Sequence, residues 1–326
     1  MKYKGDHFSI DIDIVSDLKE WAFNMLVDAG FNNVKRDSAL HQYCNMRLRR
    51  LDPKPRTVLV SKELRCPDAC KDGYAYFQGS VEKGNDLLPF MSKSILDADA
   101  KDKMIFDWGF FHFHLNKGSD TKDPRFIERS DYLLIAYVDI NHDDKMYFLQ
   151  IRPHDVSVWT EQDLVRILAD NWPEIVERYR VKGAVSLTET VTDEVYRDLR
   201  KSNVTTLVDL QDGRVFLGPN LGLNTAGTSA RASLHYNSIC NNAVLLEKGM
   251  GELADQIGRA IKMSLNTQGL NFKLRLVRPG NNDYLFKVEQ HDLLLRFFYW
   301  DGRPCIAVGD TIDEIEAAIR EGMNGE

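Results

Sequence analysis

The sequence predicts an α+β fold, with a small antiparallel sheet and packed helices in an N-terminal domain and a second α+β domain at the C-terminus. Three observations support this prediction. Aromatic and apolar segments with the two-residue period of strands gather between Met104 and Ile151. Segments with the helical period lie on both sides of them, so helices and strands are grouped rather than strictly alternating. The length of 326 residues corresponds to about two domains at roughly 150 residues each.

The N-terminal part is predicted to begin with a short strand, two helices and a second strand. The residues from Phe8 to Ile14 alternate between apolar and polar, as on a strand with one buried face. Gly30 and the prolines that follow Leu51 mark where the two helices end. The expected elements are a strand at 8–14, helices at 18–29 and 38–51, a buried strand at 57–60 and a turn-rich segment at 66–84.

The central segment is predicted to form a three-stranded meander. Met104–Leu115 (MIFDWGFFHFHL) is aromatic and alternating, which favours a strand. Tyr132–Val138 and Met146–Ile151 predict two further strands joined by a polar turn. Apolar side chains from Leu164 to Val176 then fall on one face of a helix that Pro173 would kink or break. We expect the helices to pack on this sheet.

The character of the sequence changes after Lys182, so we place a domain boundary at residue 183. Residues 1–182 are expected to form an α+β domain with a candidate histidine and arginine site, and residues 183–326 a second α+β domain of unknown role. The expected elements of the second domain are a hairpin at 205–217, a loop rich in glycine and small polar residues at 218–230, a helix at 243–264, three strands between 272 and 299 and a closing helix at 311–323.

The composition is typical of a globular protein that folds in water. Apolar residues make up 43% of the chain and charged residues 28%, and no window approaches the roughly 18 apolar residues of a membrane-spanning helix. The net charge of −7 excludes a globally basic nucleic-acid coat and a polybasic membrane anchor, but not a local basic groove. The odd number of cysteines and the absence of a signal-peptide pattern predict a reduced, cytoplasmic protein with no membrane partner.

The pair His112 and His114 is the strongest candidate for chemistry. Residues two apart on a strand point to the same face, so these imidazoles project together while Phe111 and Phe113 point to the other face. The strand therefore has one face for the core and one for other work. Arg129 precedes the second strand and His154 follows the third, and in a meander these strand ends can converge on the pair.

These residue types suit metal-independent cleavage of RNA. His112 or His114 would take the proton from a 2′-hydroxyl as general base, and His154 would protonate the leaving 5′-oxygen as general acid. Arg129 would stabilise the charge that develops on phosphorus, with Tyr147 in support. Histidine fits this chemistry because its ordinary pKa of about 6.5 lets both protonation states exist near neutrality. The prediction is a ribonuclease that needs no cofactor.

A basic run in the second helix and the residues after it could hold RNA phosphate. An acidic protein needs such a local patch to bind RNA, because phosphate contacts supply most of the affinity. The run could equally be a solvated face. The residues predicted to bind RNA are Arg47, Arg49, Arg50, Lys54 and Arg56.

Two other classes of function stay open. Paired histidines on a strand are also half of a metal site, which His154 or Asp107 could complete in a His-ligated metal enzyme. Alternatively, the chain could be a non-catalytic binding or interaction module of a bacterial defence or regulatory system, with a protein as its partner. The sequence gives no oligomeric state.

Two weaker motifs receive no assigned chemistry. Cys66 and Cys70 lack a second pair for a zinc site, so free thiols are expected. The Gly218–Gly227 segment matches neither standard phosphate-loop spacing, and no lysine follows it. A plain connector before a helix is the favoured interpretation, with an anion site at that helix N-terminus as the alternative.

The segment from about Asp107 to Trp172 resembles a widespread group of uncharacterised bacterial proteins, through DWGFFHFHL, Arg129 before YLLIAYV, MYFLQIRPHDVSVWT and DNWPE. Its order of helices, strand, arginine, strand, strand and histidine also resembles the RelE-like ribonuclease toxins. The resemblance implies a small antiparallel sheet that cuts RNA without metal, in a toxin or phage-defence setting. Arg129 would match the arginine that enters the second strand, and His154 the basic group after the third. His112 and His114 depart from typical RelE-like toxins.

Overall fold

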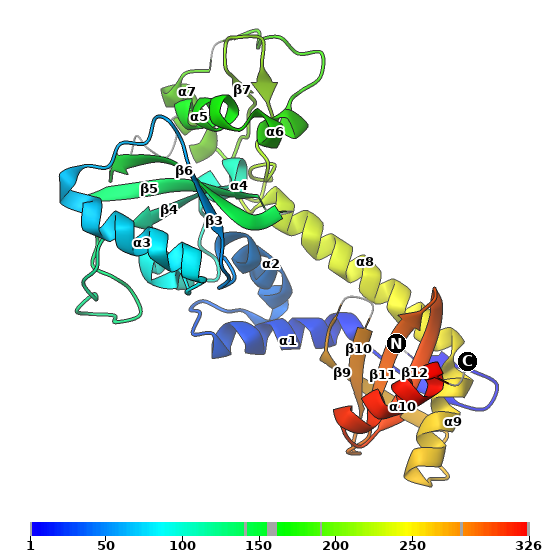
Figure 1. The fold of residues 1–326 in the computed structure, drawn as a ribbon. Helices are drawn as coiled ribbons and strands as arrows, with labels where there is room; N and C mark the ends of the chain where they lie inside the picture. The colour runs from blue at the N-terminus through cyan, green and yellow to red at the C-terminus, as the bar shows by residue number, and fades with distance from the viewer. Residues whose placement is uncertain (1, 140–141, 155–161, 190, 281–282, 325–326) are drawn as a thin grey trace. The chain divides into compact units, whose positions relative to one another are not determined.

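The computed structural model describes residues 2–139, 142–154, 162–189, 191–280 and 283–324. Helices and strands are mixed in it, and several sheets are present (Figure 1), which confirms the predicted α+β class. The chain divides into two compact units. The central unit comprises residues 30–33 and 41–235, and the terminal unit comprises the residues up to 29, 34–40 and those from 236 onward.

This division differs from the boundary predicted at residue 183. Residues 183–235 pack into the central unit, where Tyr196, Val208 and Phe216 are buried in the same apolar cluster as Phe110 of the sheet. The first residues join the terminal unit instead, because Ser9–Asp11 pairs in parallel with Asn271–Lys273. Both features depend on contacts between residues far apart in the sequence, which local periodicity does not reveal.

The terminal unit contains a six-stranded sheet in the order β1-β2-β9-β10-β11-β12. Its last strand was not predicted from the sequence. This strand follows a two-residue hairpin turn at Asp301 and Gly302, which both have the positive φ that such a turn requires. Its elements are β1 (Lys2–Lys4), β2 (Ser9–Asp11), α1 (Ile14–Asp28), most of α8 (Ala230–Glu252), α9 (Ala254–Leu265), β9 (Asn271–Arg278), β10 (Asp283–Val288), β11 (Leu294–Trp300), β12 (Arg303–Gly309) and α10 (Ile312–Asn324).

The central unit contains a four-stranded sheet in the order β3-β6-β5-β4. β4, β5 and β6 form the predicted antiparallel meander, and β3 adds to β6 in parallel. The strands are β3 (Thr57–Val60), β4 (Phe110–His114), β5 (Tyr132–Asp139) and β6 (His142–Pro153), with a small hairpin of β7 (Val208–Asp209) and β8 (Val215–Phe216). The helices are α2 (Ala39–Arg49), α3 (Lys71–Lys83), α4 (Lys103–Trp108), α5 (Asp163–Asn171), α6 (Pro173–Val176) and α7 (Asp193–Lys201).

Two predictions for the central unit are wrong. The segment predicted to be turn-rich contains α3, which buries Phe77 and Val81 and ends at Gly84 in the left-handed conformation. Gly73 allows this helix to approach the sheet, because a Cβ there would lie 2.4 Å from the carbonyl carbon of Leu115. The first half of the predicted strand 104–115 is the helix α4, which Gly109 ends with a φ of 73°.

Apolar side chains cover both faces of the four-stranded sheet. Phe111 and Phe113 of β4 pack on the face covered by α3, and Phe110 packs on the opposite face with residues of α5 and α7 (Figure 1). The alternation predicted for this strand is therefore confirmed. The face that buries Phe110 is also the face of His112 and His114, so the site described below shares a side of the sheet with an apolar core.

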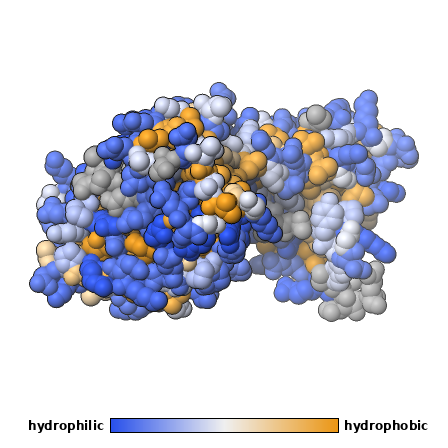
Figure 2. Space-filling view, turned by 90° about the horizontal axis from the view of Figure 1, so that it is seen from above, coloured by the Kyte–Doolittle hydropathy of each residue, from blue (hydrophilic) through white to orange (hydrophobic). Residues whose placement is uncertain are grey.

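The face of the molecule in view in Figure 2 is mostly polar. Figure 2 shows hydrophilic side chains over most of the face in view, with apolar side chains in small groups between them. Among the helices that the structure describes, none is long and apolar enough to cross a membrane.

Candidate functional site

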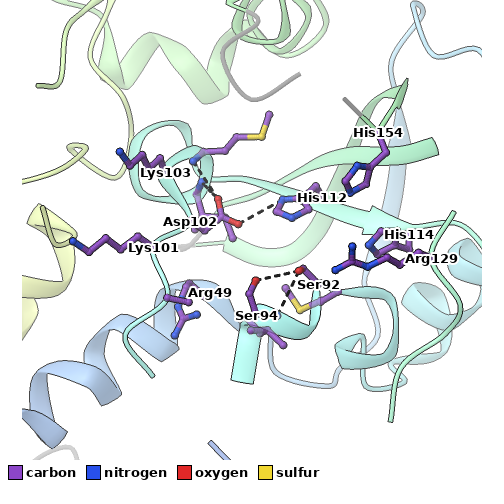
Figure 3. Close-up of a pocket in the computed structure, with 15 residues that line it drawn as sticks. Arg49, Ser92, Ser94, Lys101, Asp102, Lys103, His112, His114, Arg129 and His154 are labelled. Atoms are coloured by element: carbon purple, nitrogen blue, oxygen red, sulfur yellow. Dashed lines mark hydrogen bonds and ion pairs between the residues drawn. The ribbon is translucent and has the colours of Figure 1, made fainter. Parts of the chain in front are cut away.

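A pocket of about 480 Å³ lies against β4 and brings most of the predicted catalytic residues together (Figure 3). Its volume is within the range of roughly 300–1,000 Å³ that small-molecule sites occupy. Its polar lining consists of His112, His114, His154, Arg129, Arg49, Lys101, Lys103, Asp102, Ser92 and Ser94. The convergence expected from the meander is therefore present, and the structure adds several residues to it.

The strand register explains why the four predicted residues meet. His114 at the end of β4 faces Leu133 of β5, which in turn faces Arg152 of β6. The start of β5 and the end of β6 thus lie beside His114. Arg129 enters β5 at this point, and His154 leaves β6, where its backbone N–H donates to the carbonyl of Asp131 at 2.8 Å.

His114 is buried and neutral over the physiological pH range. His114 is only 3% exposed. Burial lowers its pKa to about 4, and the neighbouring His154, His112 and Arg129 lower it in the same direction. The backbone N–H of Ser130 donates to Nδ1 at 3.3 Å. The proton of the neutral ring therefore sits on Nε2, which makes this imidazole a hydrogen-bond donor at Nε2. Its ring stacks on His154, with centroids 5.5 Å apart.

His112 is paired with a carboxylate. Its Nδ1 lies 3.5 Å from Oδ2 of Asp102, and its side chain is 13% exposed. Asp102 is held in place because its Oδ1 accepts the backbone N–H groups of Met104 and Ile105 as the N-cap of α4. Burial lowers the pKa of His112, and Asp102 opposes that shift. A carboxylate beside one imidazole nitrogen favours the tautomer with the proton on that nitrogen, which leaves the other nitrogen able to accept a hydrogen bond.

Asp102 is not among the residues predicted from the sequence. The signal was present, because an aspartate before a helix with free N–H groups at its second and third positions is a standard cap. It was hidden by the prediction of a strand from Met104 onward, which left no helix for Asp102 to cap.

The pocket is rich in positive charge. Arg129 is exposed, and among the described residues no carboxylate forms an ion pair with it. Arg49 is 1% exposed and donates from Nη2 to the carbonyl of Asp97 at 2.9 Å, while its Nε is buried with no partner in the described part of the chain. With Lys101 and Lys103, the lining carries four cations. Such a lining suits an anion.

The predicted basic run does not form one RNA-binding face. Arg47 makes a bidentate pair with Asp52, Arg50 pairs with Asp86, and Lys54 pairs with Asp143. Arg56 is 3% exposed, and its guanidinium donates to the backbone carbonyls of Asp143, Lys54 and Asp52. Carboxylates close in space therefore neutralise most of the run. Arg49 is the member of the run that lines the pocket.

Two further candidates lie outside the pocket. Tyr147 faces Tyr137 across β5 and β6, and its ring packs on Trp172 at 5.0 Å between centroids. It shares a face with His112, but it stands level with Phe110 at the start of β4 and does not line the pocket, so the structure gives no support to the role predicted for it. Asp107, the proposed extra metal ligand, is buried against Arg200 and Tyr196.

The two weaker motifs do not line the pocket. Cys66 and Cys70 are free thiols 3.9 Å apart, and burial raises the pKa of Cys70 to about 12. In the Gly218–Gly227 segment, Asn220 and Gly222 donate to the last carbonyls of α4. That segment therefore caps a helix C-terminus.

Among the described residues, no group of three His, Cys, Asp or Glu side chains has the geometry of a metal site.

Exchanging His114 for asparagine is expected to make stability less dependent on pH. The pKa of His114 is about 4 in the folded chain and about 6.5 in an unfolded one. Between these values the unfolded state binds more protons, so stability falls as the pH drops from about 6.5 towards about 4. From pH 7 to pH 5 this loss amounts to about 2 kcal/mol. Asparagine Oδ1 can still accept the Ser130 N–H but does not titrate.

Urea unfolding at pH 7 and at pH 5 measures this difference. From pH 7 to pH 5, the free energy of unfolding should fall by about 2 kcal/mol more in the wild-type chain than in His114→Asn. His291→Asn, at an exposed position of the terminal unit, serves as the matched control and should behave like the wild type. Equal losses in the wild type and in His114→Asn would show that His114 is not buried in its neutral form.

The arrangement combines a carboxylate-paired imidazole, a neutral imidazole, an exposed imidazole and several cations around one cavity. These are the groups that general acid–base chemistry on a phosphate ester uses. No protein-family model matches the sequence, and no curated protein or solved structure matches it either. The geometry of this pocket is therefore the basis for assigning a function.

Proposed function

We propose that the chain is a ribonuclease that cleaves RNA by histidine acid–base catalysis without a metal ion. The observation that supports it best is that three histidines, two on β4 and one directly after β6, converge with four cations in one pocket of about 480 Å³. RNA cleavage of this kind needs a base near the 2′-hydroxyl, an acid near the 5′-oxygen and positive charge at the phosphate. The lining offers each of these.

His112 is the general base in this proposal. Asp102 lies 3.5 Å from its Nδ1, which leaves Nε2 to take the proton from the 2′-hydroxyl. As the proton arrives, Asp102 stabilises the imidazolium. His114 does not fit this role, because its Nδ1 already accepts from Ser130 and its Nε2 carries the proton.

His154 is the general acid, and Arg129 and His114 stabilise the phosphate. His154 is exposed and stacks on His114, so it can gain a proton from water and pass it to the leaving 5′-oxygen. Arg129 is also exposed and close enough to His114 to influence its pKa. Its guanidinium and the Nε2–H of His114 would both donate to phosphate oxygens, whose charge grows in the transition state.

The direct test incubates the purified chain with a fluorescently labelled single-stranded RNA in excess EDTA. We expect cleavage whose first product ends in a 2′,3′-cyclic phosphate, because the 2′-oxygen is the nucleophile. A 2′-O-methyl RNA of the same sequence should bind and stay intact. Binding of RNA without cleavage would overturn the ribonuclease proposal and favour a non-catalytic binding module. Cleavage that EDTA abolishes would favour the metal enzyme.

The resemblance to RelE-like toxins supplies the biological setting of this proposal, which is a toxin or a phage-defence protein that acts on cellular or phage RNA. The pocket is compatible with that setting, since its lining depends on β4, Arg129 before β5 and His154 after β6.

A further inference from the structure

Of the four cations that line the pocket, Lys101 and Lys103 lie on one side of His112 and Arg129 lies on the other, while Arg49 is engaged with the backbone carbonyl of Asp97 (Figure 3). Figure 3 shows Lys101 and Lys103 on the far side of Asp102 from His154 and Arg129, with His112 between the two groups. The first group comes from the chain around the start of α4, and the second from the ends of β5 and β6. One phosphate at the catalytic residues would use only the second group.

Positive charge is in excess at the lysine end. Asp102 is the one carboxylate among the described residues that line the pocket, and it is already engaged with His112 and with the cap of α4. Lys101 is exposed and forms no ion pair with any described residue. Lys103 donates to the backbone carbonyl of Arg200 at 2.6 Å. Burial lowers the pKa of Lys103, and the charges of Lys101 and Arg200 lower it further, as expected where cations lack an anion.

We infer that the pocket binds two successive phosphates of one RNA strand, the scissile one beside Arg129 and His154 and its neighbour beside Lys101 and Lys103. The identity of this ligand rests on the proposed function. A second phosphate would supply the anion that the lysine end lacks, and charge-assisted hydrogen bonds to it would add to the affinity. The substrate class is then an RNA whose cleaved nucleotide carries phosphate on both sides.

The roles of the histidines give this second subsite a direction. The 2′-hydroxyl belongs to the nucleotide on the 5′ side of the scissile phosphate, and the leaving oxygen belongs to the nucleotide on the 3′ side. His112, the base, lies towards the lysine end, whereas His154, the acid, lies towards Arg129 (Figure 3). The strand therefore runs with its 5′ side at Lys101 and Lys103. The phosphate held there is the 5′-phosphate of the nucleotide whose 2′-hydroxyl attacks.

Calorimetric titration with small nucleotides tests the subsite without catalysis. Adenosine 3′,5′-bisphosphate is expected to bind at least about tenfold more tightly than adenosine 3′-monophosphate, since its second phosphate adds hydrogen bonds to charged groups. Adenosine 5′-diphosphate carries a similar charge, but its two phosphates are joined and cannot reach both ends of the pocket. Its affinity should therefore not show this increase. Lys101→Gln should remove most of the gain. Lys71→Gln, an exposed lysine of α3 on the other side of the sheet, is the matched control and should keep it.

Cleavage of dinucleotides tests the direction. The dinucleotide with a 5′-phosphate, pApA, should be cleaved with a higher kcat/KM than ApAp, which carries a 3′-phosphate instead. Equal binding of the bisphosphate and the monophosphate, or a preference for ApAp, would overturn the inference while leaving RNA cleavage intact. A bisphosphate preference that depends on Lys101, in a chain that cleaves no RNA, would support the subsite and reject the ribonuclease.

Discussion

Replacing His112 by asparagine is expected to lower kcat for RNA cleavage by about two to four orders of magnitude, the usual contribution of a positioned general base. Asparagine keeps a polar group beside Asp102, which lies 3.5 Å from Nδ1 of His112 in the wild type. It cannot accept a proton, so the 2′-hydroxyl would lose its base while the cations that hold the phosphate remain. The loss should therefore appear in kcat far more than in the affinity for RNA.

Two comparisons make this result specific to the pocket. Affinity for an uncleavable 2′-O-methyl RNA should change little in His112→Asn, since Arg129 and Lys101 are untouched. His291→Asn, at an exposed position of the terminal unit, should retain wild-type kcat. If His112→Asn cleaves RNA at the wild-type rate, His112 is not the base, and the direction assigned to the strand in the pocket also fails.

Replacing Asp107 by alanine is expected to destabilise the central unit by about 3–5 kcal/mol, as when one partner of a buried ion pair is removed. Asp107 and Arg200 are 3% and 5% exposed, and Nη2 of Arg200 lies 2.9 Å from Oδ2 of Asp107. The hydroxyl of Tyr196 donates to the same carboxylate and accepts from Nε1 of Trp108. Alanine would leave the guanidinium buried without its carboxylate, although Trp108 and Tyr196 would still face it.

Chemical denaturation at pH 7 measures this loss. The double variant Asp107→Ala/Arg200→Met should be less destabilised than Asp107→Ala, because removing both charges removes the penalty of the unpaired one. Asp212→Ala breaks an exposed pair with Arg214 and should cost at most about 1 kcal/mol. A loss in Asp107→Ala no larger than in Asp212→Ala would show that the network does not anchor α7 to α4.

Local sequence patterns were sufficient to predict the faces of β4 and the convergence of the pocket. Alternation places His112 and His114 opposite Phe111 and Phe113, because side chains on a strand alternate strictly. The antiparallel order of β4, β5 and β6 places the start of β5 beside the end of β4, and it carries Arg129 to the pocket. Alternation along a strand depends only on residues that are neighbours in the sequence, so it can be predicted from a single sequence.

Features that depend on distant partners could not be predicted. The basic run from Arg47 to Arg56 predicts a positively charged surface patch. In the structure, Asp86 and Asp143, which are distant in the sequence, form ion pairs with two of its members. Most arginines are exposed, but Arg200 is buried and pairs with Asp107, which lies in another part of the chain. The division into units has the same origin, since the pairing of β2 with β9 joins the two ends of the chain.

The central claim is that the histidines of this pocket activate a 2′-hydroxyl of bound RNA. A DNA oligonucleotide with a single ribonucleotide tests it most directly, with mass spectrometry of the products formed in excess EDTA. We expect one cut, immediately 3′ of the ribonucleotide, with a 2′,3′-cyclic phosphate on the upstream fragment and a 5′-hydroxyl on the downstream one. Cuts elsewhere in the oligonucleotide, a 5′-phosphate on the downstream fragment, or no cleavage of this substrate or of an all-RNA strand would contradict the claim.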